Sequence, residues 1–472
     1  MKIIIRGGTI IPVTEPGRVL ENADLYIDDG RIAAISPDEP PFPLSAAERV
    51  IDAEGCVVLP GLVNAHGHLA LALYRGLGEW MPGTTWVGIQ ERQGALARNL
   101  EPQAYYDGAR LLIAEMIRAG ITTFADINFE PPGAPPVTDL IAQAVEATGI
   151  RACLTLETNG YIARAGARLH FDENEAKRTF QMSKEFCQHW HGRASGRITT
   201  MLGIANPPVP RRVILEWVAR AADEMGFAIQ LHVAEIAQEI REWQEFYGKS
   251  AAEMMAETGI LNAHVLGGNC VFFTAQDAQI LRDYDFHAST CPQNCCKLCL
   301  GMLDVPMLLE AGVNVALGTN EVINNNNLDM IEEMRFAALY HKMARRDPRI
   351  LGGDIPLRLI TIQGGKALNL AVGCLETGRP ADVIVMDARG PHWYPRHDMV
   401  ANVIYSSAAA DVRTVIIDGR IVMEDRRIRT FDEAEVIARV ETRLAALRAE
   451  LPAPRGVEDS AMPPEVKWTV EA

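Results

Sequence analysis

Short apolar runs that look like β-strands lie at both ends of the chain. At the start they occupy residues 2–13, 23–35 and 48–58, with Gly-Gly and Asp-Asp-Gly turn signals between them. Near the end, similar runs occupy residues 381–388 and 412–428. Because chain termini usually lie close together, we expect residues 1–58 and 371–430 to build one small β-sandwich domain.

The middle of the chain has a different rhythm. Strand-length apolar runs occupy residues 151–158, 197–204, 227–235 and 313–320. They alternate with helical segments such as 105–120 and 210–226. This alternation is typical of a parallel sheet with crossover helices, and its length favours a closed barrel over an open sheet. We therefore predict an α/β fold with a (β/α)₈ TIM barrel at 59–370, and a C-terminal helix and tail at 431–472.

The composition excludes several classes of function. Lys and Arg number 45 and Asp and Glu number 61, so the net charge is −16. A surface this acidic repels nucleic-acid phosphates and anionic membranes. The sequence contains no apolar run near the roughly 18 residues of a membrane span, and its first apolar run is too short for a signal peptide. We expect a cytoplasmic globular protein with reduced thiols that binds neither nucleic acid nor membranes.

Two histidines end one of the predicted barrel strands. His66 and His68 lie in the stretch Asn-Ala-His-Gly-His at residues 64–68. Alternate residues of a strand share one face, so both imidazoles point the same way at the strand's carboxyl end, where barrel enzymes build their sites. Such a pair suits Zn²⁺, although two ordinary histidines at a strand end have the same spacing.

A third histidine ends another predicted strand. His232 and Glu235 lie in Leu-His-Val-Ala-Glu at residues 231–235. His232 suits a third metal ligand, and Glu235 suits proton transfer between a bound water and a leaving group. A glutamate at this place is also typical of the first turn of a helix, where the helix dipole favours negative charge. Glu235 alone therefore does not establish a catalytic role.

Further motifs occur in a set order along the chain. They are AGITTFADI at 119–127, YGKSAAEMMAETGIL at 247–261, AGVNVALGTN at 311–320, NNNNLDMIEEMRFA at 324–337 and GRPADVIVMD at 378–387. Together with the histidine motifs, they resemble the amidohydrolase superfamily, specifically its branch of aromatic-ring deaminases and triazine chlorohydrolases. The resemblance covers nearly the whole chain.

This resemblance implies a function and a set of site residues. It implies a metal-dependent hydrolase with one divalent ion, usually zinc with iron as the alternative, in which metal-bound water attacks a C–N or C–Cl bond of a small nitrogen heterocycle. His66, His68 and His232 would bind the metal, and Glu235 would be the proton shuttle. The family also implies a homodimer or a larger homo-oligomer.

Several positions depart from the family's pattern. Asn269 stands where the family has a histidine that contacts the substrate or the attacking water. Asn320 stands where it has an aspartate that binds the metal and accepts the proton. A His-Ala-Pro stretch reads Ala205-Asn206-Pro207 here, and Cys295 occupies the place of an asparagine that contacts the substrate. The catalytic roles of Asn269 and Asn320 are therefore predicted to be altered.

The change to Asn320 bears on the mechanism. An amide accepts no proton near neutral pH, so Asn320 offers the metal only a neutral oxygen. The metal then keeps more positive charge, which lowers the pKa of its bound water and partly offsets the lost base. Glu321 follows directly, but adjacent strand residues face opposite ways, so it replaces the base only if a turn begins there.

Three functions remain open on these residues. The first is a metal-dependent hydrolase with Glu235 as its sole proton shuttle. The second is a metal enzyme with another reaction, such as an elimination, an isomerisation or a decarboxylation. The third is a catalytically silent relative that binds a ligand. We favour the hydrolase, because all three histidines and Glu235 are present.

Other side chains are predicted to line the substrate pocket. Trp80 and Trp86 follow the His-x-His strand and suit stacking on a flat ring. Asn206, Cys295 and Glu321 lie near predicted strand ends and are further candidates for substrate contact. We expect the heterocycle to bind between these groups and the metal.

Four cysteines cluster on a segment that we predict to run from a strand into a loop, namely Cys291, Cys295, Cys296 and Cys299. Thiols in such a cluster suit a soft metal, an iron–sulfur cluster or nucleophilic catalysis. Their spacing matches no common zinc or ferredoxin motif. We therefore interpret them as small apolar side chains in a crowded strand end.

Overall fold

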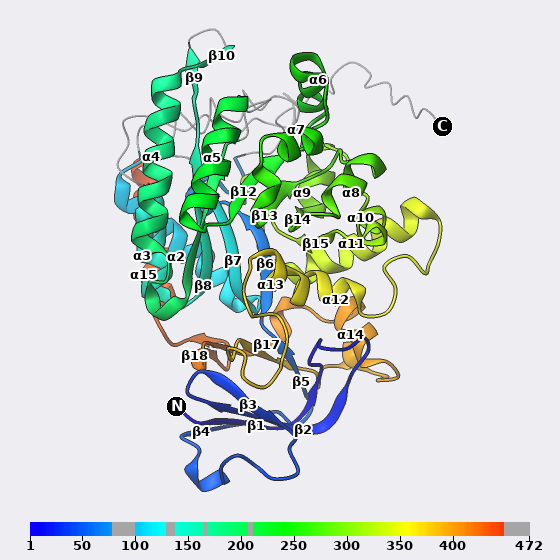
Figure 1. Cartoon of the computed structure of the whole chain (residues 1–472). Helices are drawn as coiled ribbons and strands as arrows, with labels where there is room; N and C mark the ends of the chain where they lie inside the picture. The colour runs from blue at the N-terminus through cyan, green and yellow to red at the C-terminus, as the bar shows by residue number, and fades with distance from the viewer. Residues whose placement is uncertain (78–99, 129–136, 165–167, 206–210, 448–472) are drawn as a thin grey trace, which may run out of the picture.

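Eight parallel strands form a nearly closed barrel in the computed structural model, which describes residues 1–77, 100–128, 137–164, 168–205 and 211–447 (Figure 1). They are β6 (Leu62–Gly67), β7 (Ile121–Asn128), β8 (Arg151–Thr158), β11 (Ile198–Ile204), β12 (Ile229–Val233), β13 (Val265–Asn269), β14 (Phe286–Thr290) and β15 (Asn314–Leu317). Each strand pairs with the next in chain order, and a parallel bridge between Gly67 and Asn320 links the first strand to the end of the last. The predicted α/β barrel is confirmed.

Helices cover the outside of the barrel. They are α2 (Pro102–Arg118), α3 (Val137–Thr148), α4 (Glu173–Trp190), α5 (Arg212–Met225), α6 (Ala237–Tyr247), α7 (Ala251–Glu257), α8 (Ala275–Leu281), α9 (Pro292–Lys297), α10 (Val305–Ala311), α11 (Met330–Arg345), α12 (Ile355–Leu359) and α13 (Ile362–Ala367). A short ribbon of β9 (Tyr161–Arg164) and β10 (Arg168–Phe171) extends beyond the barrel near α4 (Figure 1). Strands such as β7 and β8 are buried along their whole length, which explains their continuous apolar sequence.

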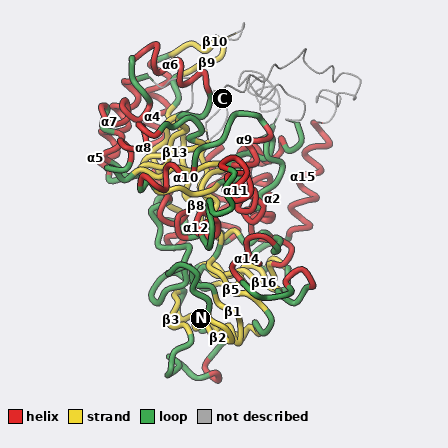
Figure 2. Tube along the Cα trace, turned by 90° about the vertical axis from the view of Figure 1, so that its right-hand side faces the viewer, coloured by secondary structure: helices red, strands yellow, loops and turns green. Residues whose placement is uncertain are grey.

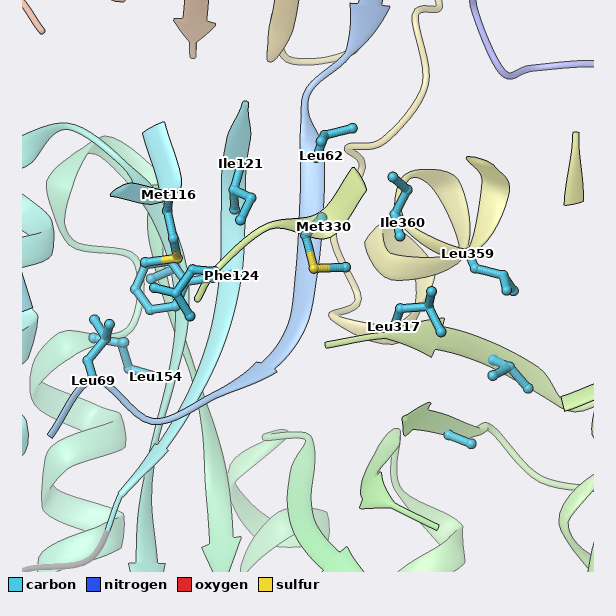
Figure 3. Close-up of a cluster of buried hydrophobic side chains, with 14 of the residues drawn as sticks. Leu62, Leu69, Met116, Ile121, Phe124, Leu154, Leu317, Met330, Leu359 and Ile360 are labelled. Carbon is cyan, nitrogen blue, oxygen red and sulfur yellow. The ribbon is translucent and has the colours of Figure 1, made fainter. Parts of the chain in front are cut away.

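The main hydrophobic core lies between the barrel strands and these helices. Figure 3 shows part of it, where Met116 of α2 lies next to Phe124 of β7 and close to Leu154 of β8. Leu317 of β15 and Leu359 of α12 belong to the same core on the other side of β6. All five side chains are at most 1% exposed. Truncating such a side chain to alanine typically costs about 2–5 kcal/mol.

Strands from both ends of the chain form a second, mixed sheet below the barrel (Figures 1 and 2). Its nine strands are β1 (Ile3–Ile10), β2 (Leu20–Asp28), β3 (Arg31–Ile35), β4 (Arg49–Asp52), β5 (Cys56–Pro60), β16 (Val383–Asp387), β17 (Val412–Ile417), β18 (Arg420–Glu424) and β19 (Arg427–Ile428). The N-terminal strand β5 pairs with the C-terminal strand β16, so the two ends share one sheet. The exact domain limits at residues 58 and 370 stay a prediction.

A buried ion pair joins the barrel to this sheet. Arg151, the first residue of β8, donates from Nε to Asp382 Oδ2 at 2.8 Å and from Nη2 to Asp382 Oδ1 at 3.1 Å. The two side chains are 6% and 1% exposed. The backbone N–H of Asp418 also donates to Asp382 Oδ1, at 2.7 Å. Because breaking a buried ion pair is costly, this contact stabilises the packing of the barrel on the second sheet.

The chain continues past the second sheet with two further helices. Helix α14 (Met399–Tyr405) lies between β16 and β17 in sequence, and α15 (Glu433–Leu447) is the predicted C-terminal helix. Helix α15 packs on α2, where Arg443 Nε donates to the buried Asp107 Oδ2 at 2.7 Å. The tail at 448–472 lies outside the described residues. No described helix is both long and apolar enough to cross a membrane.

Candidate active site

Three imidazoles meet at the carboxyl ends of the barrel strands. His66 lies in β6, His68 follows it directly after β6, and His232 lies in β12. Their candidate ligand nitrogens all lie within 4.8 Å of one another. His66 is 0% exposed and His232 8%. The structure therefore brings together the three histidines that the sequence selected.

The hydrogen bonds around these rings leave lone pairs that fit a cation. His68 Nδ1 lies 2.6 Å from the backbone oxygen of Ile127, which can only accept, so Nδ1 carries the proton and Nε2 does not. His68 Nε2 faces His232 Nε2 at 3.4 Å. Within the described part of the chain, both ring nitrogens of His66 are buried without a hydrogen-bond partner. A divalent ion held by the three histidines would be bound by one nitrogen of each ring.

The protonation of the rings agrees with this arrangement. Burial lowers the pKa of His66 well below its usual range, and burial with the nearby His232 lowers that of His68 to about 3. Burial also opposes protonation of His232, but the carboxylates of Glu157, Glu235 and Glu321 outweigh it and raise its pKa. Two rings are thus held neutral, as metal ligands must be, and the surrounding carboxylates favour a positive charge at the centre.

Small residues allow the backbone to approach these rings. A Cβ atom at Gly268 in β13 would lie 2.8 Å from His66 Cε1, and one at Gly318 after β15 would lie 2.6 Å from His66 Cβ. The end of β15 is tied to β6 by Asn64, whose Nδ2 donates to Thr319 Oγ1 at 2.8 Å. His66 therefore occupies a space that only glycine at positions 268 and 318 leaves open.

Glu235 is held at the edge of the cluster by two neighbours. Asn269 Nδ2 donates to Glu235 Oε1 at 2.9 Å. The buried Glu239 accepts the backbone N–H groups of Ala234 and Glu235 at 2.7 and 2.8 Å. Ala234 has a positive φ of 53°, so the chain turns sharply between His232 and Glu235. Glu239 stabilises this turn and thereby sets the direction of the Glu235 side chain.

The two asparagines at unusual positions form a chain of hydrogen bonds. Asn320 Nδ2 lies 3.4 Å from Asn269 Oδ1 and donates to it, and Asn269 in turn donates to Glu235. The side chain of Asn320 also interacts with the side chain of His68. Asn320 therefore lies beside the imidazoles, and its amide oxygen is its only possible metal-binding atom.

Glu321 lies closer to the site than the strand pattern predicted. Asn320 has a positive φ of 58°, so β15 has already ended and the alternation of faces no longer applies. Burial, with repulsion from Glu235, raises the pKa of Glu321 to about 7. Asn324 Nδ2 donates to Glu321 Oε1. A turn does begin at this point, which is the condition under which Glu321 could replace the lost base. Its catalytic and substrate-binding roles stay predictions.

Glu157 is a site residue that the sequence analysis missed. It is the penultimate residue of β8, and its Oε1 lies 3.5 Å from His232 Nδ1. A carboxylate behind a metal-binding imidazole orients the ring and raises its basicity. Its position near the carboxyl end of a barrel strand was the only available signal, and no motif marked it.

The cysteine cluster is divided between the interior and the surface. Cys291 and Cys295 are buried, whereas Cys296 and Cys299 are exposed. The segment follows directly after β14, and residues Pro292–Lys297 of it form helix α9, which the sequence did not predict. Burial raises the pKa of the Cys291 and Cys295 thiols, which opposes a nucleophilic role. No cysteine joins a metal-ligand cluster within the described ranges.

Some residues that were predicted to contact the substrate lie outside the described part of the structure. Trp80, Trp86 and Asn206 lie outside the described residues, so their predicted contact with the substrate stays a prediction. Cys295 follows β14 by five residues and is fully buried. Its role in substrate contact also stays a prediction.

Comparison with known proteins agrees with this geometry. The model of the amidohydrolase family matches residues 57–422. A 5-methylthioadenosine/S-adenosylhomocysteine deaminase from Syntrophomonas wolfei is 36% identical over 442 residues, which are 93% of this chain and 97% of the relative. A 5′-deoxyadenosine deaminase from Methanosarcina mazei is 36% identical over 441 residues, 92% of this chain and 96% of the relative.

Solved structures show the same fold. An adenosine deaminase from Xanthomonas campestris with bound zinc has a TM-score of 0.83 at 25% identity, and the match covers 95% of this chain and 98% of that one. An atrazine chlorohydrolase from Arthrobacter aurescens with zinc has a TM-score of 0.84 at 22% identity, covering 94% and 100%. With the relatives above, these matches identify an enzyme, a metal-dependent hydrolase of carbon–nitrogen bonds other than peptide bonds. The chain belongs to the amidohydrolase family.

Proposed function

We propose that this hydrolase removes the amino group from the ring of an aminopurine nucleoside, with a single Zn²⁺ ion held by His66, His68 and His232. The observation that carries the proposal is the meeting of three imidazoles whose candidate ligand nitrogens lie within 4.8 Å of one another, with Glu235 beside them. Among the described residues, neither ring nitrogen of the buried His66 has a hydrogen-bond partner. Two relatives named as deaminases of adenosine-type nucleosides support the choice of substrate.

The bound ion would act as a Lewis acid. It supplies Lewis-acid chemistry, which activates water near neutral pH and stabilises the negative charge that develops on the ring. Three imidazole ligands favour zinc, and iron(II) is the alternative. Asn320 is the proposed fourth ligand, through its neutral amide oxygen, because its side chain interacts with that of His68.

Glu235 is the proposed proton carrier. Its Oε1 accepts from Asn269, and its carboxylate would take a proton from the attacking water and pass it to the leaving nitrogen. In this arrangement Asn269 is a positioning residue and does not itself exchange protons. Glu321, with a pKa raised to about 7, is a second carboxyl group able to bind or release a proton near neutral pH.

The other reactions considered from the sequence receive no support. The relatives with 36% identity over almost the whole chain are deaminases, and none of the features of the site favours an elimination or a decarboxylation. The likeness to the atrazine chlorohydrolase concerns the fold, so cleavage of a C–Cl bond serves as a comparison in the test. From the family resemblance we also propose a cytoplasmic homodimer or larger homo-oligomer, which light scattering after gel filtration tests.

Ammonia release from a panel of substrates tests the proposed function. The panel contains 5′-deoxyadenosine, 5-methylthioadenosine, S-adenosylhomocysteine, adenosine, guanine and atrazine, with the zinc-loaded protein and a His66→Asn variant. We expect ammonia from at least one adenosine-type nucleoside and none with His66→Asn. Release from no nucleoside by a protein that carries zinc would refute the proposed substrate class. Equal release by His66→Asn would refute the proposed metal centre.

A further inference from the structure

A second group of potential metal ligands lies at the opposite end of the barrel. His264 directly precedes β13, Asp285 directly precedes β14, and His287 is the second residue of β14. These are the amino-terminal ends of the strands, whereas His66 and His232 lie at the carboxyl ends. The candidate ligand atoms of the three residues lie within 4.8 Å of one another. The group is thus separate from the active site.

The carboxylate of Asp285 bridges the two imidazoles. Its Oδ2 lies 2.9 Å from His264 Nδ1, and its Oδ1 lies 2.9 Å from His287 Nε2. The imidazole rings are 4.4 Å apart between centroids and inclined by 33°. Each side chain therefore directs one candidate ligand atom to the same small region.

The hydrogen-bond partners of His264 show that this region needs a positively charged species. His264 Nε2 lies 3.0 Å from the backbone oxygen of Ala367. A carbonyl oxygen only accepts, so Nε2 carries the proton, and Nδ1 of the neutral ring holds a lone pair. That lone pair points at the Asp285 carboxylate, which also only accepts. Two acceptors at 2.9 Å need a positive species between or beside them, either a second proton on His264 or a metal ion.

The pattern at His264 is the one that metal-binding histidines show. Such a ring donates its second N–H to a backbone carbonyl or a carboxylate, which fixes its orientation and makes the free nitrogen a better ligand. Here the carbonyl of Ala367, the last residue of α13, has this role. The ligand is thus oriented before any ion binds.

The surroundings leave the group open on one side. The side chains of His264 and His287 are 9% and 11% exposed, whereas that of Asp285 is 65% exposed. An ion bound here would have two nearly buried imidazoles on one side and the exposed Asp285 carboxylate on the other. Water completes its coordination from the solvent side, as in metal sites with three protein ligands.

We propose that His264, Asp285 and His287 form a second binding site for a divalent transition metal such as Zn²⁺. Tetrahedral zinc with bonds of about 2.0–2.1 Å places its ligand atoms about 3.3 Å apart. The Asp285 carboxylate can meet this spacing by rotating, because its side chain is exposed. The proposal does not depend on the substrate of the active site.

Zinc binding to the metal-stripped full-length protein tests the second site. We expect the parent to bind about one more zinc ion per chain than Asp285→Asn or His287→Gln, as counted by titration calorimetry and elemental analysis. Zinc should also raise the melting temperature of the parent more than that of either variant. The matched control is His392→Gln, because His392 also contacts an aspartate, Asp411, at 3.1 Å but belongs to no three-ligand group of the described chain.

The result can be separated from binding at the active site. A His66→Asn variant is expected to lose the other ion and to keep the one at Asp285. If the parent and Asp285→Asn bind the same number of ions, and His287→Gln agrees, then a second proton on His264 accounts for the contact and the proposal is overturned. Melting of each variant without metal shows whether it is folded.

Discussion

Replacement of Glu235 by glutamine separates proton transfer from binding. The Asn269 Nδ2–Glu235 Oε1 hydrogen bond of 2.9 Å survives in Glu235→Gln, because the glutamine oxygen can take the place of Oε1. The amide nitrogen then occupies the place of Oε2 and cannot accept a proton. None of the three histidines loses its ligand nitrogen, so the bound metal should be retained.

The expected loss is that of one general acid–base group. Such groups contribute about 10²–10⁴-fold, which corresponds to about 3–5 kcal/mol of activation free energy. We expect kcat for nucleoside deamination to fall by this factor, KM to change little, and the zinc content to equal that of the parent. Stopped assays of ammonia release, with elemental analysis of the same samples, measure all three quantities.

Two further variants make the result decisive. Glu242→Gln is the matched control, since Glu242 is a partly exposed glutamate of α6 that accepts a hydrogen bond from Gln238. It should retain the activity of the parent. Turnover of Glu235→Gln within threefold of the parent would refute the proposed proton path. If Glu321→Gln then lost activity instead, Glu321 would be the carrier.

Three other predictions follow from separate parts of the structure. Asn320→Asp replaces a neutral ligand by a charged one, so we expect slower loss of metal to a chelator. It also sets a carboxylate oxygen against Asn269 Oδ1, so we expect kcat to fall about tenfold or more. Asp382→Ala leaves the buried Arg151 with only Asp418, whose Oδ1 lies 3.5 Å from Arg151 Nη2, and chemical denaturation should show a loss of about 3–5 kcal/mol in the free energy of unfolding. Burial raises the pKa of Glu333 from about 4.5 to about 8. The folded protein therefore binds this proton more tightly than the unfolded chain, so stability falls as pH rises from 5 to 8, and Glu333→Gln should reduce that fall in thermal melts.

Each of these predictions has a contrary outcome. Higher deamination by Asn320→Asp would mean that the asparagine is a decayed ligand rather than an adapted one. A loss under 1 kcal/mol in Asp382→Ala would mean that Arg151 finds solvent or another partner. Identical pH profiles for the parent and Glu333→Gln would mean that Glu333 stays ionised in the folded protein.

The fold could be predicted because its signals are local and repeated. Buried parallel strands such as β7 and β8 have continuous apolar sequences, and each is separated from the next by a helix with an apolar stripe. His66, His68 and His232 were predictable for the same reason, since each lies near the carboxyl end of such a strand and these ends meet in a barrel.

The rest of the site depends on geometry that the strand pattern does not contain. Glu321 enters the site because Asn320 takes a left-handed conformation, which ends the alternation of faces. Glu157 carries no motif, and only the barrel sets it behind His232. The group around Asp285 joins the starts of two strands, and no pattern of spacing in the sequence connects them.

The most direct test of the metal-dependent hydrolase is the restoration of activity to the stripped enzyme. The protein is freed of metal with a chelator, zinc is returned in small steps, and ammonia release from 5′-deoxyadenosine or 5-methylthioadenosine is measured at each step. With the Asp285→Asn variant, in which the three-histidine site is the one intact ligand group among the described residues, we expect activity to rise from background and level off near one zinc ion per chain. Full activity in the stripped protein, or no recovery despite bound zinc, would contradict the account.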